Sequence, residues 1–260
     1  MKAVILAGGY GSRLSEETKT IPKPMVEIGG KPIIWHIMKT YEHYGITEFV
    51  VCCGYKQYAI KEYFANYFQH NCDMTVDLSN NSVQIHQNKS EKWKVTMVDT
   101  GLNTMTGGRI KQIQPYIGKS RFCLTYGDGV SDVDITDTIR VHERNKALLT
   151  LTAYLPTGKF GSLSIDEESG AVKSFSEKPK ENDNHWINAG YFVCEPEVFD
   201  FIPENDMSCV FEKEPLEKIA RTGRMHAYKH TGFWKPMDML KDNKELNEMW
   251  NQGKAPWKVW

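Results

Sequence analysis

Four segments of the chain consist almost entirely of apolar or β-branched residues, and each is five to seven residues long. A strand with both faces buried in a parallel sheet has this pattern, because neither row of its side chains meets water. The sequence therefore predicts strands at residues 2–6, 47–53, 121–126 and 148–154.

Segments with the helical repeat alternate with these strands. Between residues 33 and 44 the apolar side chains fall on one helical face, Pro32 suits the first turn and Gly45 suits the end. Further helices are predicted at residues 57–68, 109–117 and 135–145, with Asp134 as the N-cap of the last. Residues 1–145 therefore predict a doubly wound α/β core, with a Rossmann-like, mixed but mainly parallel sheet flanked by helices.

The helical repeat is lost between residues 74 and 99. Segments 74–78, 82–87 and 93–99 have the pattern of strands, and Asn80-Asn81 suits a turn between the first two. These residues predict a small antiparallel excursion from the main sheet. An excursion of this kind often builds one wall of a binding site, because irregular segments beside a rigid sheet often carry function.

The second half of the chain has a mixed pattern. Strands are predicted at residues 162–165, 171–177 and 187–194, and helices at residues 196–202, 212–220 and 237–250. No repeat, low-complexity tract or linker interrupts the sequence. We therefore expect residues 1–260 to form a single domain whose two lobes, 1–145 and 146–260, share one sheet.

Composition limits the kind of ligand. The formal net charge is -1, so the chain lacks the basic excess that binds nucleic-acid backbones, and we expect a small ligand held by a few placed residues. No apolar stretch approaches the ~20 residues that span a bilayer, and the N-terminal apolar run is already a strand. These features predict a cytoplasmic protein without membrane partners. The six cysteines show no paired spacing, which disfavours a zinc site or a disulfide framework.

The first strand leads directly into a glycine-rich segment, Ala7-Gly-Gly-Tyr-Gly-Ser-Arg-Leu14. Its glycines at 8, 9 and 11 let the backbone approach an anion and point N–H groups at it. Arg13 and Lys23 add two positive charges, which a simple turn between a strand and a helix would not explain. A dinucleotide-binding fingerprint requires a further glycine where this chain has Leu14. The segment therefore predicts a nucleoside triphosphate site.

Two aspartates are candidates for a metal site. Asp128 follows the strand predicted at 121–126 and so lies at the carboxyl edge of the sheet, where open α/β sheets bind ligands; a solvated Asp-Gly turn is the alternative. Asp238 lies just inside the helix predicted at 237–250, where an aspartate commonly serves only the helix dipole. Together the two carboxylates suit one Mg²⁺ ion, which takes its other ligands from water and substrate phosphates.

Three further segments carry polar residues suited to a ligand. Lys178 ends a predicted strand before Pro179, where it is either solvated or placed to bind the phosphate of an acceptor. The amide of Asn188 both donates and accepts, which suits sugar hydroxyls or core hydrogen bonds, and Gly190 permits close approach. The glycine pair within 104–109 opens a helix whose N–H groups suit a base edge or an anion.

Motifs of several other enzyme classes are absent. The sequence contains no H-E-x-x-H, no G-x-S-x-G and no G-x-x-x-x-G-K-[ST]. Zinc hydrolysis, acyl transfer at a nucleophile elbow and P-loop ATP hydrolysis are therefore excluded.

Several segments together resemble the sugar-1-phosphate nucleotidyltransferase family. They are residues 6–14, 22–25, 126–128, 177–179 and 188–190, in the family's order and spacing over nearly the whole chain. Further segments are similar to the cytidylyltransferases of that family, namely 26–32, 52–55, 61–67, 105–109, 232–234, 236–238 and 254–260. The resemblance implies a Mg²⁺-dependent enzyme that converts CTP and glucose 1-phosphate into CDP-glucose and pyrophosphate, toward the dideoxysugars of surface polysaccharide.

The resemblance also implies a role for each candidate residue by matched motif position. Arg13, Lys23 and Asp128 are the implied catalytic residues, and Asp128 and Asp238 are the implied Mg²⁺ ligands. The sugar phosphate is expected at Glu177, Lys178, Asn188 and Gly190. The nucleotide is expected at Leu6, Ala7, Gly8, Gly9, Tyr10, Gly11, Ser12, Arg13, Lys23, Thr104, Gly108, Arg109 and Asp128.

The chain departs from the family pattern near the presumed sugar pocket. Ala189 stands where a glycine is frequent, and Lys235 stands where a glutamine is frequent. The same chemistry with another sugar phosphate, or with UTP or dTTP, is therefore one alternative, and a nucleotide-binding regulator without turnover is another. Because the family forms oligomers, we expect a homo-oligomer.

Overall fold

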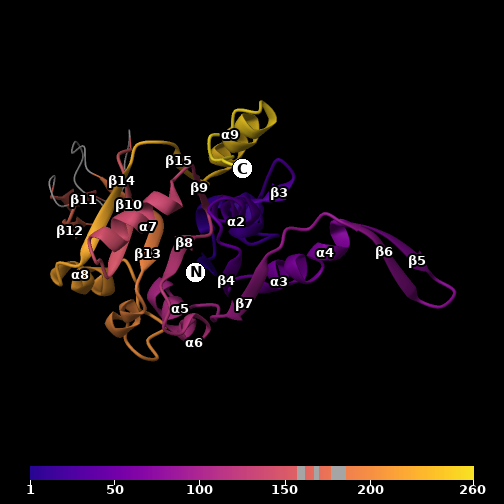
Figure 1. The fold of residues 1–260 in the computed structure, drawn as a ribbon. Coiled ribbons are helices and arrows are strands. Elements are labelled where there is room, and N and C mark those ends of the chain that lie inside the picture. The colour runs from indigo at the N-terminus through magenta and orange to yellow at the C-terminus, as the bar shows by residue number, and fades with distance from the viewer. Residues whose placement is uncertain (157–161, 167–169, 177–185) are drawn as a thin grey trace.

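The computed structural model describes residues 1–156, 162–166, 170–176 and 186–260, and a large twisted sheet forms its centre (Figure 1). Within these residues the sheet has seven strands, in the order β14-β10-β13-β8-β1-β4-β7. Strand β1 is parallel to β4 and β8, β4 is parallel to β7, and β10 is parallel to β14. Strand β13 is antiparallel to both of its neighbours. The predicted α/β fold with a mixed, mainly parallel sheet is confirmed.

The four strands predicted from continuous apolar runs are all present in this sheet. They are β1 (Lys2–Ala7), β4 (Glu48–Cys53), β8 (Phe122–Tyr126) and β10 (Leu149–Tyr154). The other three are β7 (Lys94–Asp99), β13 (Ile187–Cys194) and β14 (Met225–His230). The four strands of the first half therefore lie side by side, the three strands of the second half lie side by side, and the two groups join in one sheet where β13 pairs with β8.

The helices agree with the predicted pattern in position and differ in continuity. Helices α2 (Ile33–His43) and α7 (Ile135–Arg144) are confirmed, and the Asp134 carboxylate caps α7 by accepting from the Asp137 N–H. Residues 57–68 form two helices, α3 (Gln57–Ala65) and α4 (Tyr67–His70), and residues 109–117 form parts of α5 (Thr106–Gln112) and α6 (Gln114–Ile117). Pro115, which has no N–H, lies in the first turn of α6 and explains why α5 does not continue.

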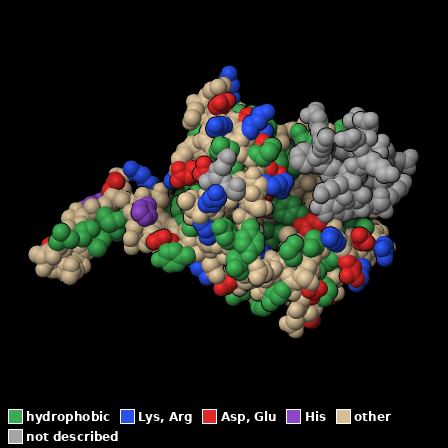
Figure 2. Space-filling view, turned by 180° about the vertical axis from the view of Figure 1, so that it is seen from behind, with side chains coloured by type: hydrophobic (Ala, Val, Ile, Leu, Met, Phe, Trp, Pro, Cys, Tyr) green, Lys and Arg blue, Asp and Glu red, His purple; other side chains and the backbone are tan. Residues whose placement is uncertain are grey.

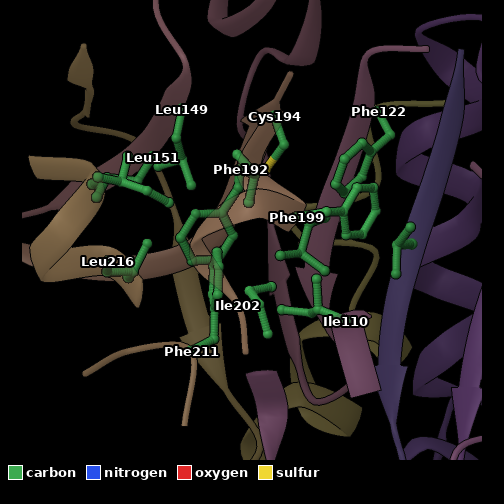
Figure 3. Close-up of a cluster of buried hydrophobic side chains, with 14 of the residues drawn as sticks. Ile110, Phe122, Leu149, Leu151, Phe192, Cys194, Phe199, Ile202, Phe211 and Leu216 are labelled. Atoms are coloured by element: carbon green, nitrogen blue, oxygen red, sulfur yellow. The ribbon is translucent and has the colours of Figure 1, made fainter. Parts of the chain in front are cut away.

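Two hydrophobic cores pack against opposite faces of the sheet, since successive side chains of a strand point to opposite sides. Val4 belongs to one core, whereas Ala3 and Ile5 belong to the other beneath α2. Figure 3 shows the first core, in which Phe122 stacks on Phe199 with ring centroids 5.3 Å apart. The sheet is thus covered on both faces, which leaves its carboxyl edge as the place where backbone and polar groups are open to a ligand.

The predicted antiparallel excursion is partly confirmed. Strands β5 (Cys72–Asp77) and β6 (Ser82–Asn88) form an antiparallel hairpin that projects from the body of the protein (Figure 1). The prediction for the third segment, residues 93–99, is wrong, because this segment forms β7, which pairs in parallel with β4 in the main sheet. The apolar side chains of the hairpin lie along the projecting arm in Figure 2 and are exposed, and they include Val76, Leu78, Val83 and Ile85.

The second half of the chain adds smaller elements around the sheet. The predicted strands and helices are present as β11 (Ser162–Ile165), β12 (Val172–Ser176), β13, the 3-10 helix η3 (Pro196–Phe201), α8 (Glu214–Arg221) and α9 (Leu240–Asn251). Short ladders that the sequence did not predict join β9 (Gly129–Ser131) to β15 (Trp234–Pro236), and β2 (Glu27–Ile28) to β3 (Lys31–Pro32). In the described part of the chain, no helix is both long and apolar enough to cross a bilayer. All six cysteines are free thiols.

Candidate active site

A cavity of about 410 Å³ opens at the carboxyl edge of the sheet, where β1 and β8 end. The glycine-rich segment that follows β1 forms one side of it, and the end of β8 and the start of α5 form the others. Its lining residues are Leu6, Ala7, Gly8, Gly9, Gly11, Ser12, Arg13, Lys23, Pro24, Thr104, Met105, Thr106, Arg109, Tyr126, Gly127 and Asp128. None of the described lining residues comes from the β5–β6 hairpin, so the hairpin forms no wall of this cavity.

A buried arginine holds the glycine-rich segment in place. Arg109 is 4% exposed, and its guanidinium donates to the carbonyls of Gly8 at 2.9 Å, Gly101 at 2.8 Å and Cys53 at 3.2 Å. It also donates to the Thr100 hydroxyl at 2.7 Å. A Cβ on Gly8 would lie 2.2 Å from the guanidinium, so the glycine is required here by the arginine. Arg109 therefore fixes the shape of the glycine-rich segment through hydrogen bonds to backbone carbonyls.

At the mouth of the cavity, one lysine contacts two aspartates. The ammonium of Lys23 lies 2.7 Å from Asp128 Oδ2 and 2.7 Å from Asp238 Oδ1, and Arg13 Nη1 lies 2.6 Å from Asp238 Oδ2. Burial acts to lower the pKa of Lys23, but attraction to and hydrogen bonds with the two carboxylates outweigh it, so the pKa is raised above its ordinary value. The lysine is therefore a fixed positive charge at neutral pH.

The β9–β15 ladder explains why aspartates so far apart in the sequence meet. Gly129 in β9 pairs with Pro236 in β15, and the N–H of Met237 donates to the carbonyl of Asp128 at 2.8 Å. Asp238 precedes α9 rather than lying inside a helix, which corrects the sequence prediction. Its N–H donates to the carboxylate of Asp242 in the first turn of α9, at 3.1 Å, and this bond fixes the loop that carries it.

The two carboxylates fit a hard divalent cation. Their oxygens converge on one point, because a single ammonium lies at hydrogen-bond distance from both. No group of three or more acidic, histidine or cysteine side chains suited to a metal occurs among the described residues. A site with two protein carboxylates suits Mg²⁺, which keeps several waters and takes further oxygen ligands from phosphates.

A second cavity of about 190 Å³ adjoins the first and shares Arg13, Tyr126 and Asp128 with it. Its other lining residues are Thr125, Gly129, Asn188, Ala189, Tyr191, Trp234, Pro236 and Asp238. The site therefore has a larger and a smaller compartment that meet at the charged residues. Two reactants held one in each compartment would face each other across Arg13 and the two aspartates.

Comparison with known proteins identifies the family. The sequence model of the family described as "Nucleotidyl transferase" matches residues 2–248. The chain belongs to this nucleotidyl transferase family. It is 54% identical over 261 residues to the glucose-1-phosphate cytidylyltransferase of Salmonella typhi and 47% identical over 261 residues to the probable glucose-1-phosphate cytidylyltransferase of Bacillus subtilis, with all of both chains covered each time. The crystal structure of HddC from Yersinia pseudotuberculosis superposes with a TM-score of 0.74 at 25% identity, covering 96% of this chain and 99% of that one.

The structure places nearly all residues predicted for the nucleotide at the larger cavity of this nucleotidyl transferase. The exceptions are Tyr10, whose hydroxyl donates to Asn103 at 2.6 Å, and Gly108, which packs against the backbone of Met207. The N–H groups of Gly107 and Gly108 both donate to the carbonyl of Cys209. The prediction that these N–H groups are available to a base or an anion is therefore wrong. The nucleotide contacts of Thr104 and Arg109 stay predictions.

Residues predicted for the sugar phosphate divide into two groups. Asn188 lines the smaller cavity, whereas Glu177 and Lys178 lie outside the described residues. Gly190 has a φ of +79°, and a Cβ there would lie 2.3 Å from the ring of Tyr126. The group that packs closely against this glycine is therefore the Tyr126 ring. Of the two departures from the family pattern, Ala189 lines the cavity and Lys235 instead pairs with carboxylates of α9.

Sequence analysis did not select Tyr126 or Trp234, which both line the smaller cavity. The indole N–H of Trp234 donates to the carbonyl of Ala189 at 2.7 Å and closes one side of that cavity. A signal for both was available, since each aromatic residue stands within four positions of a candidate metal ligand, Asp128 or Asp238.

Proposed function

We propose that this protein transfers CMP from CTP to α-D-glucose 1-phosphate, with formation of CDP-glucose and release of pyrophosphate. The observation that carries the proposal is the pair of cavities that meet at Arg13, Lys23, Asp128 and Asp238. Similarity over the full length to two proteins with glucose-1-phosphate cytidylyltransferase names supports CTP and glucose 1-phosphate as the substrates. The nucleotide would occupy the larger cavity and the sugar phosphate the smaller one.

The chemistry is a direct displacement at the α-phosphorus of the nucleotide. An oxygen of the sugar phosphate forms the new P–O bond while the bond to pyrophosphate breaks in line with it. The nucleophile is already anionic at neutral pH, so no side chain has to remove a proton. Catalysis consists of holding the two phosphates in line and offsetting their negative charge.

The protein's own residues supply both requirements. The glycine-rich segment offers backbone N–H groups to the triphosphate, and Arg109 fixes the shape of that segment from behind. Arg13 and Lys23 bring two positive charges to the boundary between the compartments, where charge develops on the leaving pyrophosphate. Because Arg109 holds the glycine-rich segment before the substrates arrive, little reorganisation of its N–H groups is needed during the reaction.

Nucleotidyltransferases in general use a divalent metal ion, and we propose Mg²⁺ for this one. Asp128 and Asp238 would hold it, since their oxygens converge beside the cavity. When bound, the ion offsets charge on phosphate oxygens and orients them. The ammonium of Lys23 lies at hydrogen-bond distance from both carboxylates, so with the ion held there the lysine would be free to contact phosphate.

We also propose a homo-oligomer located in the cytoplasm, whose product supplies sugar chemistry toward surface polysaccharide. The exposed apolar side chains of the β5–β6 hairpin support the oligomer, because a two-stranded hairpin is marginally stable without further packing. Light scattering of the purified protein measures the oligomeric state. A monomer at micromolar concentration would contradict this part of the proposal.

The test of function is pyrophosphate release with Mg²⁺ over a grid of nucleotides and sugar phosphates. CTP, UTP, dTTP and ATP are each paired with glucose 1-phosphate, mannose 1-phosphate and galactose 1-phosphate. We expect turnover with CTP and glucose 1-phosphate and at least tenfold less with every other pair. A different preferred pair would overturn the substrates while keeping the mechanism, and no turnover with any pair would favour a nucleotide-binding regulator.

A further inference from the structure

A continuous series of hydrogen bonds joins the two cavities through Glu212. The hydroxyl of Thr106, which lines the larger cavity, donates to Glu212 Oε2 at 2.5 Å. The hydroxyl of Tyr126, which lines both cavities, donates to Glu212 Oε1 at 2.6 Å. Asn188, in the smaller cavity, donates from Nδ2 to the Tyr126 hydroxyl at 3.3 Å and accepts at Oδ1 from the N–H of Gly190 at 2.8 Å.

Glu212 belongs to neither cavity and is placed between them by the buried core. Its neighbour Phe211 is fully buried, and Phe192 lies against it with ring centroids 6.1 Å apart. The N–H of Phe211 donates to the Thr106 hydroxyl oxygen at 2.9 Å. The Thr106 oxygen accepts this bond, and its own proton is directed at the Glu212 carboxylate. Glu212 is therefore linked to α5 through its side chain and also through its neighbour Phe211.

The carboxylate fixes the direction of every bond in the series. An ionised carboxylate only accepts, so the hydroxyls of both Thr106 and Tyr126 must donate to it. The Tyr126 oxygen then has only lone pairs left, and it can bond Asn188 only through the amide NH₂. The Gly190 N–H needs the Asn188 amide oxygen as its acceptor. The Tyr126 oxygen fixes the amide NH₂ and the Gly190 N–H fixes the amide oxygen, so only one of the two possible amide orientations satisfies both bonds.

Burial, followed by the charge of Glu212, raises the pKa of Tyr126 well above its ordinary value. The phenol therefore keeps its proton throughout the physiological range, as the series requires. The described residues use one N–H and one lone pair of the Asn188 amide, which leaves one of each among these contacts, and Asn188 lines the smaller cavity.

We propose that Glu212 is a positioning residue that orients the Asn188 amide for the acceptor sugar phosphate and ties that orientation to the nucleotide side of the site through Thr106. The proposal rests on the proposed function, because it assigns the smaller cavity to the acceptor. Glu212 itself touches neither substrate. Its effect reaches the acceptor through Tyr126 and Asn188.

The variant Glu212→Gln tests this arrangement at nearly constant volume. Glutamine offers an NH₂ group to Tyr126, which allows the phenol to turn its proton toward Asn188 and the amide to flip. Loss of one hydrogen bond to a charged group corresponds to a roughly 10- to 100-fold change in a binding constant. We expect KM for glucose 1-phosphate to rise by that factor, with KM for CTP changed by less than about threefold on the same scale.

Two further variants separate positioning from general damage to the fold. Tyr126→Phe removes the same connection without altering the carboxylate, so it should raise the acceptor KM similarly, and the double variant should lose no more than either single one. Glu214→Gln is the matched control, because Glu214 is 67% exposed and pairs with Lys218 on the surface of α8. It should leave both KM values unchanged. Thermal unfolding of all four variants checks that they are folded, and Tyr126→Phe carries the test if Glu212→Gln is not.

Several results would overturn the proposal. These are equal increases in both KM values, unchanged KM values in Glu212→Gln, or independent, multiplicative losses in the double variant. Failure of the proposed function is distinguishable, because it appears first in the wild-type protein, as no turnover or as turnover with another acceptor. In the latter case the same variants are measured with the acceptor that the wild type uses.

Discussion

Replacing Lys23 by methionine removes the ammonium that contacts both candidate metal ligands while keeping a side chain of similar length. The structure predicts two separate effects, one on the reaction and one on metal binding. The reaction loses a positive charge at the boundary of the two cavities. The carboxylates of Asp128 and Asp238 lose their shared partner and face each other without it.

The size of the catalytic loss follows from the burial of Lys23. Lys23 is only 6% exposed and lines the larger cavity, so its charge is little screened by water. Removing one such charge-stabilising group costs about 3 kcal/mol of transition-state stabilisation. At roughly 1.4 kcal/mol per factor of ten, kcat/KM should fall about 150-fold.

The effect on metal binding has the opposite sign. Without Mg²⁺ the variant should be less stable by about 2 kcal/mol, a value reduced from that of a fully buried pair because the side chain of Asp128 is 32% exposed. With Mg²⁺ the variant should gain more thermal stability than the wild type, because the ion no longer displaces an ammonium. The expected result is therefore a larger Mg²⁺-induced rise in Tm.

Pyrophosphate release and thermal unfolding with and without Mg²⁺ measure the two effects. The control is Lys39→Met, since Lys39 is 18% exposed and pairs with Glu42 within α2, away from both cavities. It should change neither activity nor the response to Mg²⁺. Activity of Lys23→Met within tenfold of the wild type would refute the catalytic role. An equal Mg²⁺-induced rise in Tm would refute competition between the lysine and the ion.

Two other variants test buried packing, one in the core beneath α2 and one beside the smaller cavity. Burial lowers the pKa of His36 from 6.5 to about 4, so the unfolded chain binds the proton first and the free energy of unfolding falls as pH drops from 6.5 toward 4. The loss at pH 5 is about 2 kcal/mol. Urea unfolding should show this loss in the wild type and in His43→Gln, an exposed control, but not in His36→Gln. Gly190→Ala should lower Tm and the kcat/KM for the acceptor more than Gly223→Ala, since both glycines have positive φ but only the former would press a Cβ against Tyr126. Equal losses in the two glycine variants would remove the argument for close packing at Gly190.

The strands that the sequence predicted well are those buried on both faces. β1 and β8 lie at the centre of the sheet and carry continuous apolar runs, which neither a helix nor a loop would explain. β14 was missed because it lies at the edge of the sheet and mixes His226 and Lys229 with apolar residues. The pairing of β7 with β4 was missed because local alternation shows that a segment is a strand and does not show its partner.

The candidate site was predictable in its residue types and not in its connections. Glycines followed by Arg13 and Lys23 indicated phosphate binding from local sequence alone. The meeting of Asp128 and Asp238 at Lys23 depends on the β9–β15 ladder, whose strands have three residues each and no distinctive pattern. Glu212 could not be selected from the sequence, because there it is one of several acidic residues before α8, and only its hydrogen bonds with Thr106 and Tyr126 distinguish it.

The β9–β15 ladder also sets an order of events during synthesis of the chain. The ribosome adds the glycine-rich segment, Lys23 and Asp128 first, and Asp238 follows 110 residues after Asp128. At roughly 5 to 20 residues per second, that interval is about 5 to 20 s. Throughout it the nascent chain carries the glycine-rich segment with only one of the two carboxylates that we propose as metal ligands. The complete site can therefore form only near the end of synthesis. A chain interrupted before β15 would have the glycine-rich segment but lack the carboxylate pair.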